Sequence, residues 1–499
     1  MQIVPNERIE EFLHGVDDEK YIIAVEPDYT KPEVTVIVNH PESGKFKYKQ
    51  KFQPFLWMKE DLTHILYGGK RMKIYDMAKK YDVKFKRLTT CNDEGYEPER
   101  MTNGYKYLVK TKKSYNDLIN YFKEGGVDLF SKEFSKYVVM FSPVEQFLIQ
   151  TGKRLFKGME DYNDIHRLQY DLETEGLSPS KDAIFQIGIR DNRGYERVLE
   201  VSGSTQSERR QSEREIIQQF FNIVDDINPD MITGYNSENF DWDFIFNRAE
   251  RLGLTINGVI ARLRNINRMY RKASTLKLGG ETEAYMQTYI PNFNVIDISH
   301  AVRRAMAINS EIKSWSLKSI TKYSGIAKPN RVYVAGDIIN KTWEDKEHHY
   351  AFNDTNGDWY KISEKYPLKD GYTTVNGEYI VQRYLLDDLW ETEQIDYIYN
   401  QASFLISKIL PTTFMRCSTM GTAGQWKLIM AAWSYQNNLA IPETQTKRDF
   451  TGGLSRLLEV GYARNVVKLD FAALYPKTQL TWSIFPALDI SGVMRGILT

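Results

Sequence analysis

Between residues 168 and 252, short apolar segments of strand character alternate with amphipathic helical segments. The strand-like segments are 168–173, 183–189 and 231–235, and the helical segments are 207–224 and 241–252. In the first helical segment, apolar residues recur at the spacing of one helix face, at Ile216, Ile217, Phe220, Phe221 and Val224. Such alternation is typical of a sheet covered by helices, so an α/β layer is predicted here.

The whole chain is predicted to be an α/β multi-domain protein, because 499 residues exceed one ordinary domain. Residues 1–150 contain strand-like runs and are predicted to form an N-terminal α+β domain. Residues 151–400 contain the α/β layer with a mixed sheet. Residues 401–499 are predicted to hold connecting helices and then part of a further domain.

Four local predictions concern segments outside this layer. A helical pattern covers 395–436, with interruptions expected at Pro411 and at 421–424, and a strand is expected at 465–470. A hairpin is expected around 369–378, within an insertion before Tyr384. The segment 278–281 is a candidate for another hairpin.

Residues 45–52 alternate lysines with mostly aromatic residues, which predicts a strand with lysines on one face. An edge strand with solvated lysines is the favoured interpretation, because charge discourages edge-to-edge aggregation. A strand that lines a nucleic-acid groove is the alternative.

Composition excludes several classes of protein. The chain has 66 Lys and Arg against 66 Asp and Glu, so any binding to phosphate must come from local basic clusters. Its two cysteines, Cys91 and Cys417, lie far apart, which fits a reducing compartment and excludes a disulfide scaffold. The first residues carry no signal-peptide pattern and no apolar run is long enough to span a bilayer, so a cytoplasmic location is expected.

Asp171 and Glu173 are two residues apart on a predicted strand, so both side chains point to the same face. Two carboxylates placed in this way can share a hard divalent cation such as Mg²⁺. A pair of such ions can stabilise the attacking and leaving oxygens of a phosphodiester, but needs about four carboxylates.

Two further segments can supply the missing carboxylates. Asp241 is placed at the start of a predicted helix, where an acid also interacts favourably with the helix dipole. Asp243 is less suitable, because the helix turns it away. Tyr384 and Asp388 are four residues apart and share one helix face, whereas Asp387 lies on another.

These three segments read Asp-x-Glu-Thr, Asn-x-x-x-Phe-Asp and Tyr-x-x-x-Asp in chain order. Together they resemble the three exonuclease motifs of family B DNA polymerases, whose proofreading domain has a ribonuclease-H-like fold. The resemblance implies that Asp171, Glu173, Asp241 and Asp388 are catalytic, metal-binding acids assisted by Tyr384. It also implies two Mg²⁺ or Mn²⁺ ions per active site and 3′→5′ hydrolysis of a single-stranded DNA end.

The run 467–476 contains Asp470-Phe471-Ala472-Ala473-Leu474-Tyr475-Pro476 and resembles the first palm motif of the same family. The resemblance implies that Asp470 binds metal and nucleotide, that the Phe471 carbonyl contributes, and that Tyr475 is the steric gate under the sugar. Gly452 and Gly453 resemble the glycine pair that contacts DNA between the exonuclease and the palm.

The family's second palm acid pair and its fingers helix do not occur after Asp470. Nucleotidyl transfer from dNTPs to primer-template is therefore expected only if another part, such as a second polypeptide carrying the remaining palm, fingers and thumb, completes the site. A phage replicative polymerase in the host cytoplasm is the favoured source. An autonomous exonuclease and a primer-template-binding scaffold subunit are the alternatives.

A basic cluster without acids lies between Arg262 and Lys277. If this segment is helical, Arg264, Arg268 and Arg271 share one face and are candidate DNA-binding residues. A solvated basic surface is the alternative.

Overall fold

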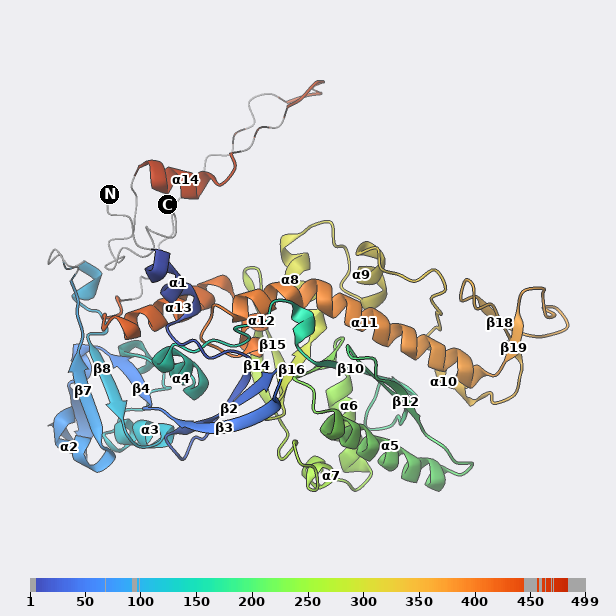
Figure 1. Ribbon diagram of the computed structural model, residues 1–499, viewed down its shortest axis with the longest axis horizontal. Coiled ribbons are helices and arrows are strands. Elements are labelled where there is room, and N and C mark those ends of the chain that lie inside the picture. Colours follow the sequence, from blue (N-terminus) through green and yellow to red (C-terminus); the bar gives the residue numbers. More distant parts are fainter. Residues whose placement is uncertain are drawn as a thin grey trace.

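The computed structural model describes residues 6–67, 69–91, 97 and 99–443, together with 456, 460–462, 464–467, 469 and 471–482. The N-terminal elements occupy one end of an elongated molecule, and helix α11 (Gly377–Ser407) runs along it toward the other end (Figure 1). No helix in the described part of the chain is long and apolar enough to cross a membrane.

A five-stranded mixed sheet organises the centre of the molecule, in the order β12-β11-β10-β13-β16. Its strands are β10 (Arg167–Thr174), β11 (Ile184–Asp191), β12 (Glu196–Glu200), β13 (Met231–Gly234) and β16 (Asn294–Asp297). Strands β10, β11 and β12 are antiparallel neighbours, whereas β10, β13 and β16 are parallel. The predicted α/β class with a mixed sheet is confirmed.

Helices cover this sheet because their apolar faces match its apolar strands. The helices of this region, apart from α11, are α5 (Gln206–Ile227), α6 (Asp241–Arg251), α7 (Ile256–Ile260), α8 (Ile298–Ile308), α9 (Leu317–Tyr323) and α10 (Ile339–Glu344). Thr205 starts α5 with a capping box that includes Glu208. The five apolar residues predicted to form one face of this helix are all buried.

The segment 270–289 forms an antiparallel hairpin, β14 (Tyr270–Leu278) and β15 (Glu281–Tyr289), with Gly279 at φ +58° in its turn. The expected hairpin at 278–281 is confirmed. The shared face of Arg264, Arg268 and Arg271, which depended on a helix in this segment, is not formed. Residues 262–269 form no helix, and Arg271 lies on β14, because strand pairing with β15 satisfies the backbone in place of helical bonds.

The insertion before α11 contains a small sheet, β18-β17-β19. Its strands are β17 (Tyr350–Phe352), β18 (Trp359–Lys361) and β19 (Thr373–Val375). The hairpin expected at 369–378 is wrong, because β19 pairs with β17 and Asn376 caps the start of α11 through the Tyr379 N–H.

The N-terminal region contains two sheets, in the orders β1-β2-β3 and β7-β8-β4-β9, and the hairpin β5-β6. Its elements are α1 (Asn6–His14), β1 (Ile22–Pro27), β2 (Glu33–His40), β3 (Gly44–Lys51), β4 (Phe55–Met58), β5 (His64–Tyr67), β6 (Lys70–Lys73), α2 (Ile74–Tyr81), β7 (Val83–Arg87), β8 (Tyr107–Thr111), α3 (Tyr115–Glu124), β9 (Val138–Val139) and α4 (Pro143–Thr151). The lysine-rich β3 is an edge strand, as the favoured interpretation requires, but its Lys45 is not solvated, because Nζ donates to the Pro229 carbonyl at 2.7 Å.

After α11 the chain forms α12 (Phe414–Thr419) and α13 (Thr422–Gln436), and 474–481 forms α14 (Leu474–Thr481). The expected interruption at 421–424 is only partly right, because Gly421 precedes α13 but Gly424 lies within it. Residues 464–467 and 469 form no strand, and Val466, Val467 and Leu469 are mostly exposed. The strand predicted at 465–470 is therefore wrong for these residues, because no described strand pairs with them.

Candidate metal centre

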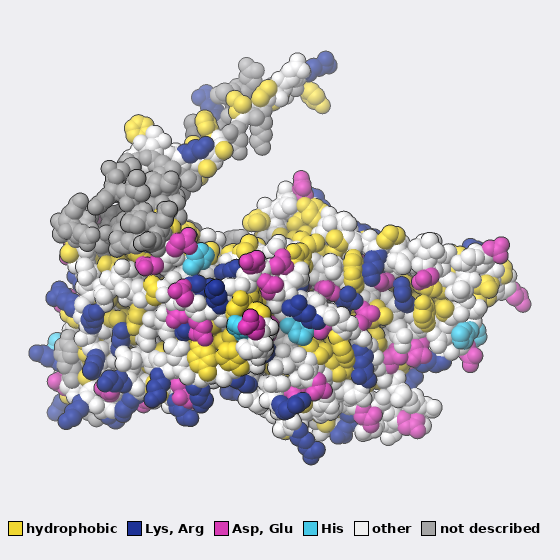
Figure 2. Space-filling model, viewed as in Figure 1, with side chains coloured by type: hydrophobic (Ala, Val, Ile, Leu, Met, Phe, Trp, Pro, Cys, Tyr) yellow, Lys and Arg dark blue, Asp and Glu magenta, His cyan; other side chains and the backbone are white. Residues whose placement is uncertain are grey.

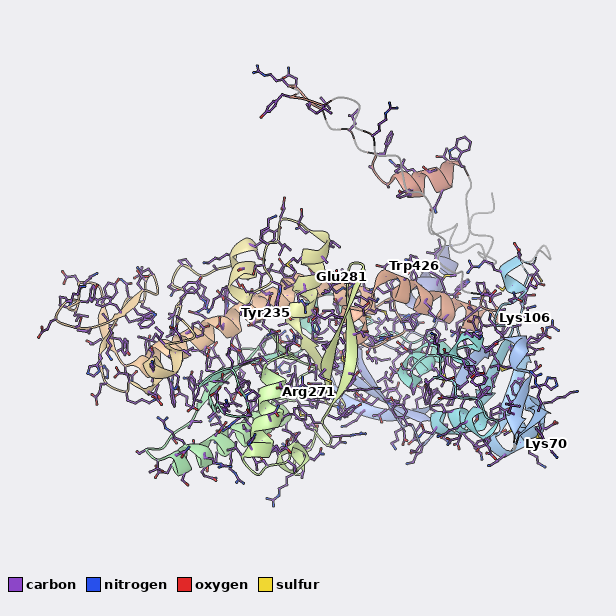
Figure 3. All side chains as sticks on the ribbon, turned by 180° about the vertical axis from the view of Figure 1, so that it is seen from behind. Lys70, Lys106, Tyr235, Arg271, Glu281 and Trp426 are labelled. Atoms are coloured by element: carbon purple, nitrogen blue, oxygen red, sulfur yellow. The ribbon has the colours of Figure 1, made fainter. Side chains whose placement is uncertain are left out.

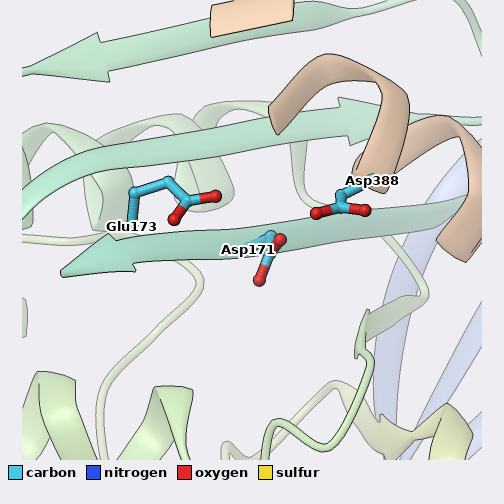
Figure 4. A group of neighbouring side chains, drawn as sticks. All are labelled: Asp171, Glu173 and Asp388. Atoms are coloured by element: carbon cyan, nitrogen blue, oxygen red, sulfur yellow. The ribbon is translucent and has the colours of Figure 1, made fainter. Parts of the chain in front are cut away.

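Strand β10 presents Asp171 and Glu173 on one face while Leu172 between them enters the core, as alternation along a strand requires. The strand lies between β11 and β13 near the middle of the sheet, so its backbone is held on both sides. The two carboxylates are therefore presented from a rigid support (Figure 4).

Helix α11 brings the third carboxylate to this strand. Opposite Asp171 on β11 stands Gly188, where a Cβ would come within 2.7 Å of Leu389 Cδ1 and 2.8 Å of Leu385 Cγ. The absence of a side chain at Gly188 lets α11 pack directly on the sheet. Asp388, between these two leucines, then reaches the β10 carboxylates (Figure 4).

One carboxylate oxygen from each of Asp171, Glu173 and Asp388 lies within 4.8 Å of the other two. Such a set of oxygen donors fits a hard divalent cation, since three carboxylates this close repel each other unless a cation or protons offset their charge. Burial is the main cause that raises the pKa of Asp171 and Glu173 well above their ordinary values. The charges of Asp241 and Asp388 then raise the pKa of Asp171 further.

Asp241 begins helix α6, in the first turn as predicted, and is only 2% exposed. Burial and then the charge of Asp297 raise its pKa to about 7, although backbone hydrogen bonds oppose this. Its Oδ1 has no hydrogen-bond partner among the described residues. Asp241 lies outside the cluster of three, but its unsatisfied oxygen and its effect on Asp171 favour a role as a further ligand.

The loop before Asp241 is held by buried acids that the sequence did not single out. Asp297 accepts hydrogen bonds from the N–H groups of Asn236 (2.9 Å) and Glu238 (3.1 Å). The Glu238 carboxylate in turn accepts bonds from the Thr288 N–H and hydroxyl. These bonds fix the entry into α6 and so the position of Asp241.

Arg331 is a buried cation beside the cluster that sequence reasoning missed. It is 3% exposed, its Nε donates to Glu391 Oε1 at 3.0 Å, and its Nη2 donates to Asp388. Its Nη1 also lies 3.9 Å from Asp387 Oδ2. Arg331 therefore offsets part of the negative charge on α11, and Asp387 is committed to Arg331, Lys328 and the Val332 N–H.

Lys318, on α9, is the second missed cation. Its Nζ donates to Tyr384 Oη at 2.6 Å and lies 4.4 Å from the centre of that ring. Burial, followed by the charges of Asp388, Glu173 and Asp171, raises the pKa of Tyr384 far above its ordinary value, so the phenol keeps its proton. Because Lys318 donates to Oη, the tyrosine proton is directed toward another acceptor, and the Asp388 carboxylate is hydrogen-bonded to this hydroxyl.

The three arginines predicted to bind DNA are in different environments. Arg264 is exposed, and its Nη2 lies 3.2 Å from Asp226 Oδ1. The guanidinium carbon of Arg268 lies 4.6 Å from the centre of the Tyr270 ring. Arg271 lies on β14 and is labelled in Figure 3; it donates to Asp243 Oδ1 at 2.8 Å and to the Glu238 carbonyl. Arg271 is therefore occupied in holding the loop before Asp241.

The residues predicted to bind nucleotide, and the glycine pair predicted to contact DNA, are only partly described. Asp470, Gly452 and Gly453 lie outside the described residues. Phe471 and Tyr475 are 77% and 81% exposed. The roles of all five stay predictions.

Residues 156–320 match the family model described as DNA polymerase family B, exonuclease domain. A DNA polymerase from Pyrococcus glycovorans is 24% identical over 375 residues, which cover 72% of this chain and 41% of that protein. DNA polymerase 2 of Aeropyrum pernix is 22% identical over 311 residues, which cover 62% of this chain and 32% of that protein. The chain thus spans less than half the length of these curated relatives.

The structure of the family B DNA polymerase from the hyperthermophilic archaeon Pyrobaculum calidifontis is similar to this one, with a TM-score of 0.55 and 15% sequence identity. The similarity covers 86% of this chain and 51% of that chain, and at this identity it shows the fold alone. The organisms of these proteins are archaeal, so the expected phage origin finds no support among them.

Proposed function

We propose that this chain, whose residues 156–320 belong to the exonuclease domain of DNA polymerase family B, hydrolyses DNA from the 3′ end. The observation that carries the proposal is the cluster of Asp171, Glu173 and Asp388, half-buried to buried, in which one carboxylate oxygen of each residue lies within 4.8 Å of the other two. Asp241 adds a fourth carboxylate with an unsatisfied oxygen. Surface acids are usually solvated, whereas this set is costly to bury without a cation.

In this proposal the four acids hold two divalent cations, Mg²⁺ or Mn²⁺. When bound, such ions lower the pKa of water, neutralise phosphate charge and stabilise the leaving oxygen. Asp171 and Glu173 set the position of the site from the sheet, and Asp388 closes it from α11. Lys318 and Arg331 add positive charge beside the acids, which favours approach of a phosphodiester.

Tyr384 orients the attacking water in this proposal. Lys318 donates to the oxygen of Tyr384, and the hydroxyl is hydrogen-bonded to Asp388, so the water that it would orient lies beside that carboxylate. We expect Tyr384→Phe and Lys318→Met each to lower kcat by about tenfold to a hundredfold with little change in KM. Single-turnover hydrolysis of a DNA oligonucleotide measures this. The control is Tyr379→Phe on the same helix, whose side chain is 37% exposed, and rates equal to this control would exclude a role for the tyrosine hydroxyl.

Cation binding is expected to tighten as the pH rises. The pKa values of Asp171 and Glu173 are raised well above their ordinary values, and that of Asp241 is raised to about 7, so protons compete with the cation. The affinity for Mn²⁺ should rise by up to about tenfold per pH unit for each proton released and level off above the raised pKa. The free energy of unfolding of the metal-free protein should fall over the same range, as the pH rises from the pKa of these acids in the unfolded chain to their pKa in the folded protein. Calorimetric titration with Mn²⁺ across this range checks the prediction, and a flat affinity would contradict it.

The polarity of hydrolysis tests the proposed function. A single-stranded DNA labelled at its 5′ end should yield progressively shorter labelled strands with Mg²⁺ and none with EDTA. The same strand labelled at its 3′ end should release labelled mononucleotide at once. Internal cuts, or release from the 5′ end first, would refute a 3′ exonuclease.

Template-directed synthesis of DNA is proposed only on the condition that further motifs complete the site. Asp470, Phe471 and Tyr475 would take part with dNTPs and primer-template once the remaining palm and fingers motifs are supplied, in the same polypeptide or in a second one. A cytoplasmic location, where both substrates occur, completes the proposal.

A further inference from the structure

The sheet β7-β8-β4-β9 has two differently covered faces. Helices α2 and α3 pack on the face that carries Leu56 and Val109. The other face carries Phe55, Trp57 and Leu108, which pack with residues of α13 such as Trp433. On this second face the sheet continues outward to its edge strand β7.

Three lysines occupy that outer part of the second face. Lys84 and Lys86 are two residues apart on β7 and so point to one side, and Lys84 stands directly opposite Lys110 on β8. Phe55 is in turn opposite Lys110, which places the lysines on the face covered by α13. We name Lys84, Lys86 and Lys110 the lysine triad.

No acid neutralises the lysine triad within the described structure. Lys86 donates to the Asn438 side chain, and Lys110 Nζ donates to Tyr435 Oη at 2.5 Å and lies 4.4 Å from the centre of that ring. Burial, and then the charge of Lys86, lowers the pKa of Lys110 to about 8. Lys84 and Lys110 are like charges directly opposite each other on the sheet, which is destabilising. A bound anion would offset this repulsion.

Protection of a sheet edge does not account for the triad. Lysines on edge strands do deter aggregation, which would explain Lys84 and Lys86 alone. Lys110, however, lies on an interior strand and is half-buried, where a cation without an acid partner is costly. The surroundings reinforce its charge, since residues 44–140 contain 21 Lys and Arg against 12 Asp and Glu in a chain of zero net charge.

We propose that the lysine triad binds the phosphate backbone of a single nucleic-acid strand. Lys84 and Lys86 are exposed and present two point charges on the open edge of a sheet, which suits an extended strand better than an enclosed small anion. Lys and Arg side chains gather over this end of the molecule, which holds β7, β8 and α2 (Figures 1 and 2). That the strand is DNA rests on the proposed function.

The experiment measures binding of oligo(dT) and oligo(U) over a range of salt concentrations in EDTA, so that hydrolysis plays no part. We expect Lys84→Gln/Lys86→Gln to reduce the slope of log K against log salt by about 1.4, since each phosphate contact on a single strand contributes about 0.7. The matched control is Lys79→Gln/Lys123→Gln, which removes the same charge from exposed positions on α2 and α3, and its slope should stay near that of the wild type.

Further arms separate the possible outcomes. Lys84→Arg/Lys86→Arg should restore the slope, and equal melting temperatures should show that all variants fold. A slope that falls with oligo(dT) identifies DNA, and one that falls only with oligo(U) identifies RNA as the strand. Equal slopes for the Lys84→Gln/Lys86→Gln variant and for the control, with both oligonucleotides, would overturn the inference. A reduced slope without any exonuclease activity would leave the inference standing while the proposed function fails.

Discussion

Asp171→Asn is expected to lower the rate of 3′-end hydrolysis by at least about 10³-fold, because several kcal/mol of transition-state stabilisation depend on the cations that this carboxylate helps to hold. Asp171 is at the centre of the site, since its pKa responds to Asp241, Asp388 and Glu173 alike. The change removes one negative charge and keeps the shape of the side chain. Single-turnover rates on a 5′-labelled strand measure the loss, and Glu173→Gln should behave similarly.

The same substitution should stabilise the metal-free protein. It removes a buried charge that repels its neighbours, so the free energy of unfolding in EDTA should rise by on the order of 1 kcal/mol. The control is Asp243→Asn, on the first turn of α6 two residues from Asp241, whose partner is Arg271 and whose side chain is 46% exposed. Its hydrolysis rate should stay within a few-fold of the wild type. A loss of rate at Asp243 equal to that at Asp171 would indicate general disruption rather than lost cation binding.

Arg331→Met is expected to destabilise the metal-free protein by about 3–5 kcal/mol, because removing one partner of a buried ion pair leaves uncompensated charge. Arg331 donates to both Asp388 and Glu391 and is near Asp387, so its removal takes the cation from Asp388 and Glu391 and leaves Asp387 with Lys328 alone. Burial already raises the pKa of Glu391 to about 7 while the guanidinium is present. Without Arg331 that pKa should rise further.

Denaturant unfolding in EDTA and in excess Mg²⁺ checks this prediction. Mg²⁺ should restore part of the lost stability, because a cation held by Asp388 offsets some of the missing charge. Arg264→Met is the control, since its ion pair with Asp226 is exposed and such pairs contribute only about 0–1 kcal/mol. Equal losses for Arg331 and Arg264 would show that the buried network does not depend on the guanidinium.

Local periodicity was sufficient to predict the parts of the site that lie on regular elements. The alternation along 168–173 placed Asp171 and Glu173 on one face, and the spacing of four placed Tyr384 above Asp388 on α11. In both cases one element with a fixed repeat determines the direction of the side chains. Their catalytic roles remain predictions.

Contacts between distant segments were not predictable in this way. Arg331 lies in an irregular segment, and nothing in its neighbourhood along the chain shows that it reaches Asp388. The arginines at 264, 268 and 271 have helical spacing, yet pairing with β15 makes the last of them part of a strand. Gly188 was included in a predicted strand, but its importance for the approach of α11 appears only when the helix and sheet are packed together.

Diffraction from crystals soaked in MnCl₂, recorded at the manganese absorption edge, tests the central claim most directly. The carboxylate cluster is predicted to show two anomalous peaks, with Asp171, Glu173, Asp388 and Asp241 as protein ligands. Absence of manganese from these carboxylates, with Arg331 still bonded to Asp388, would contradict a two-metal hydrolytic centre.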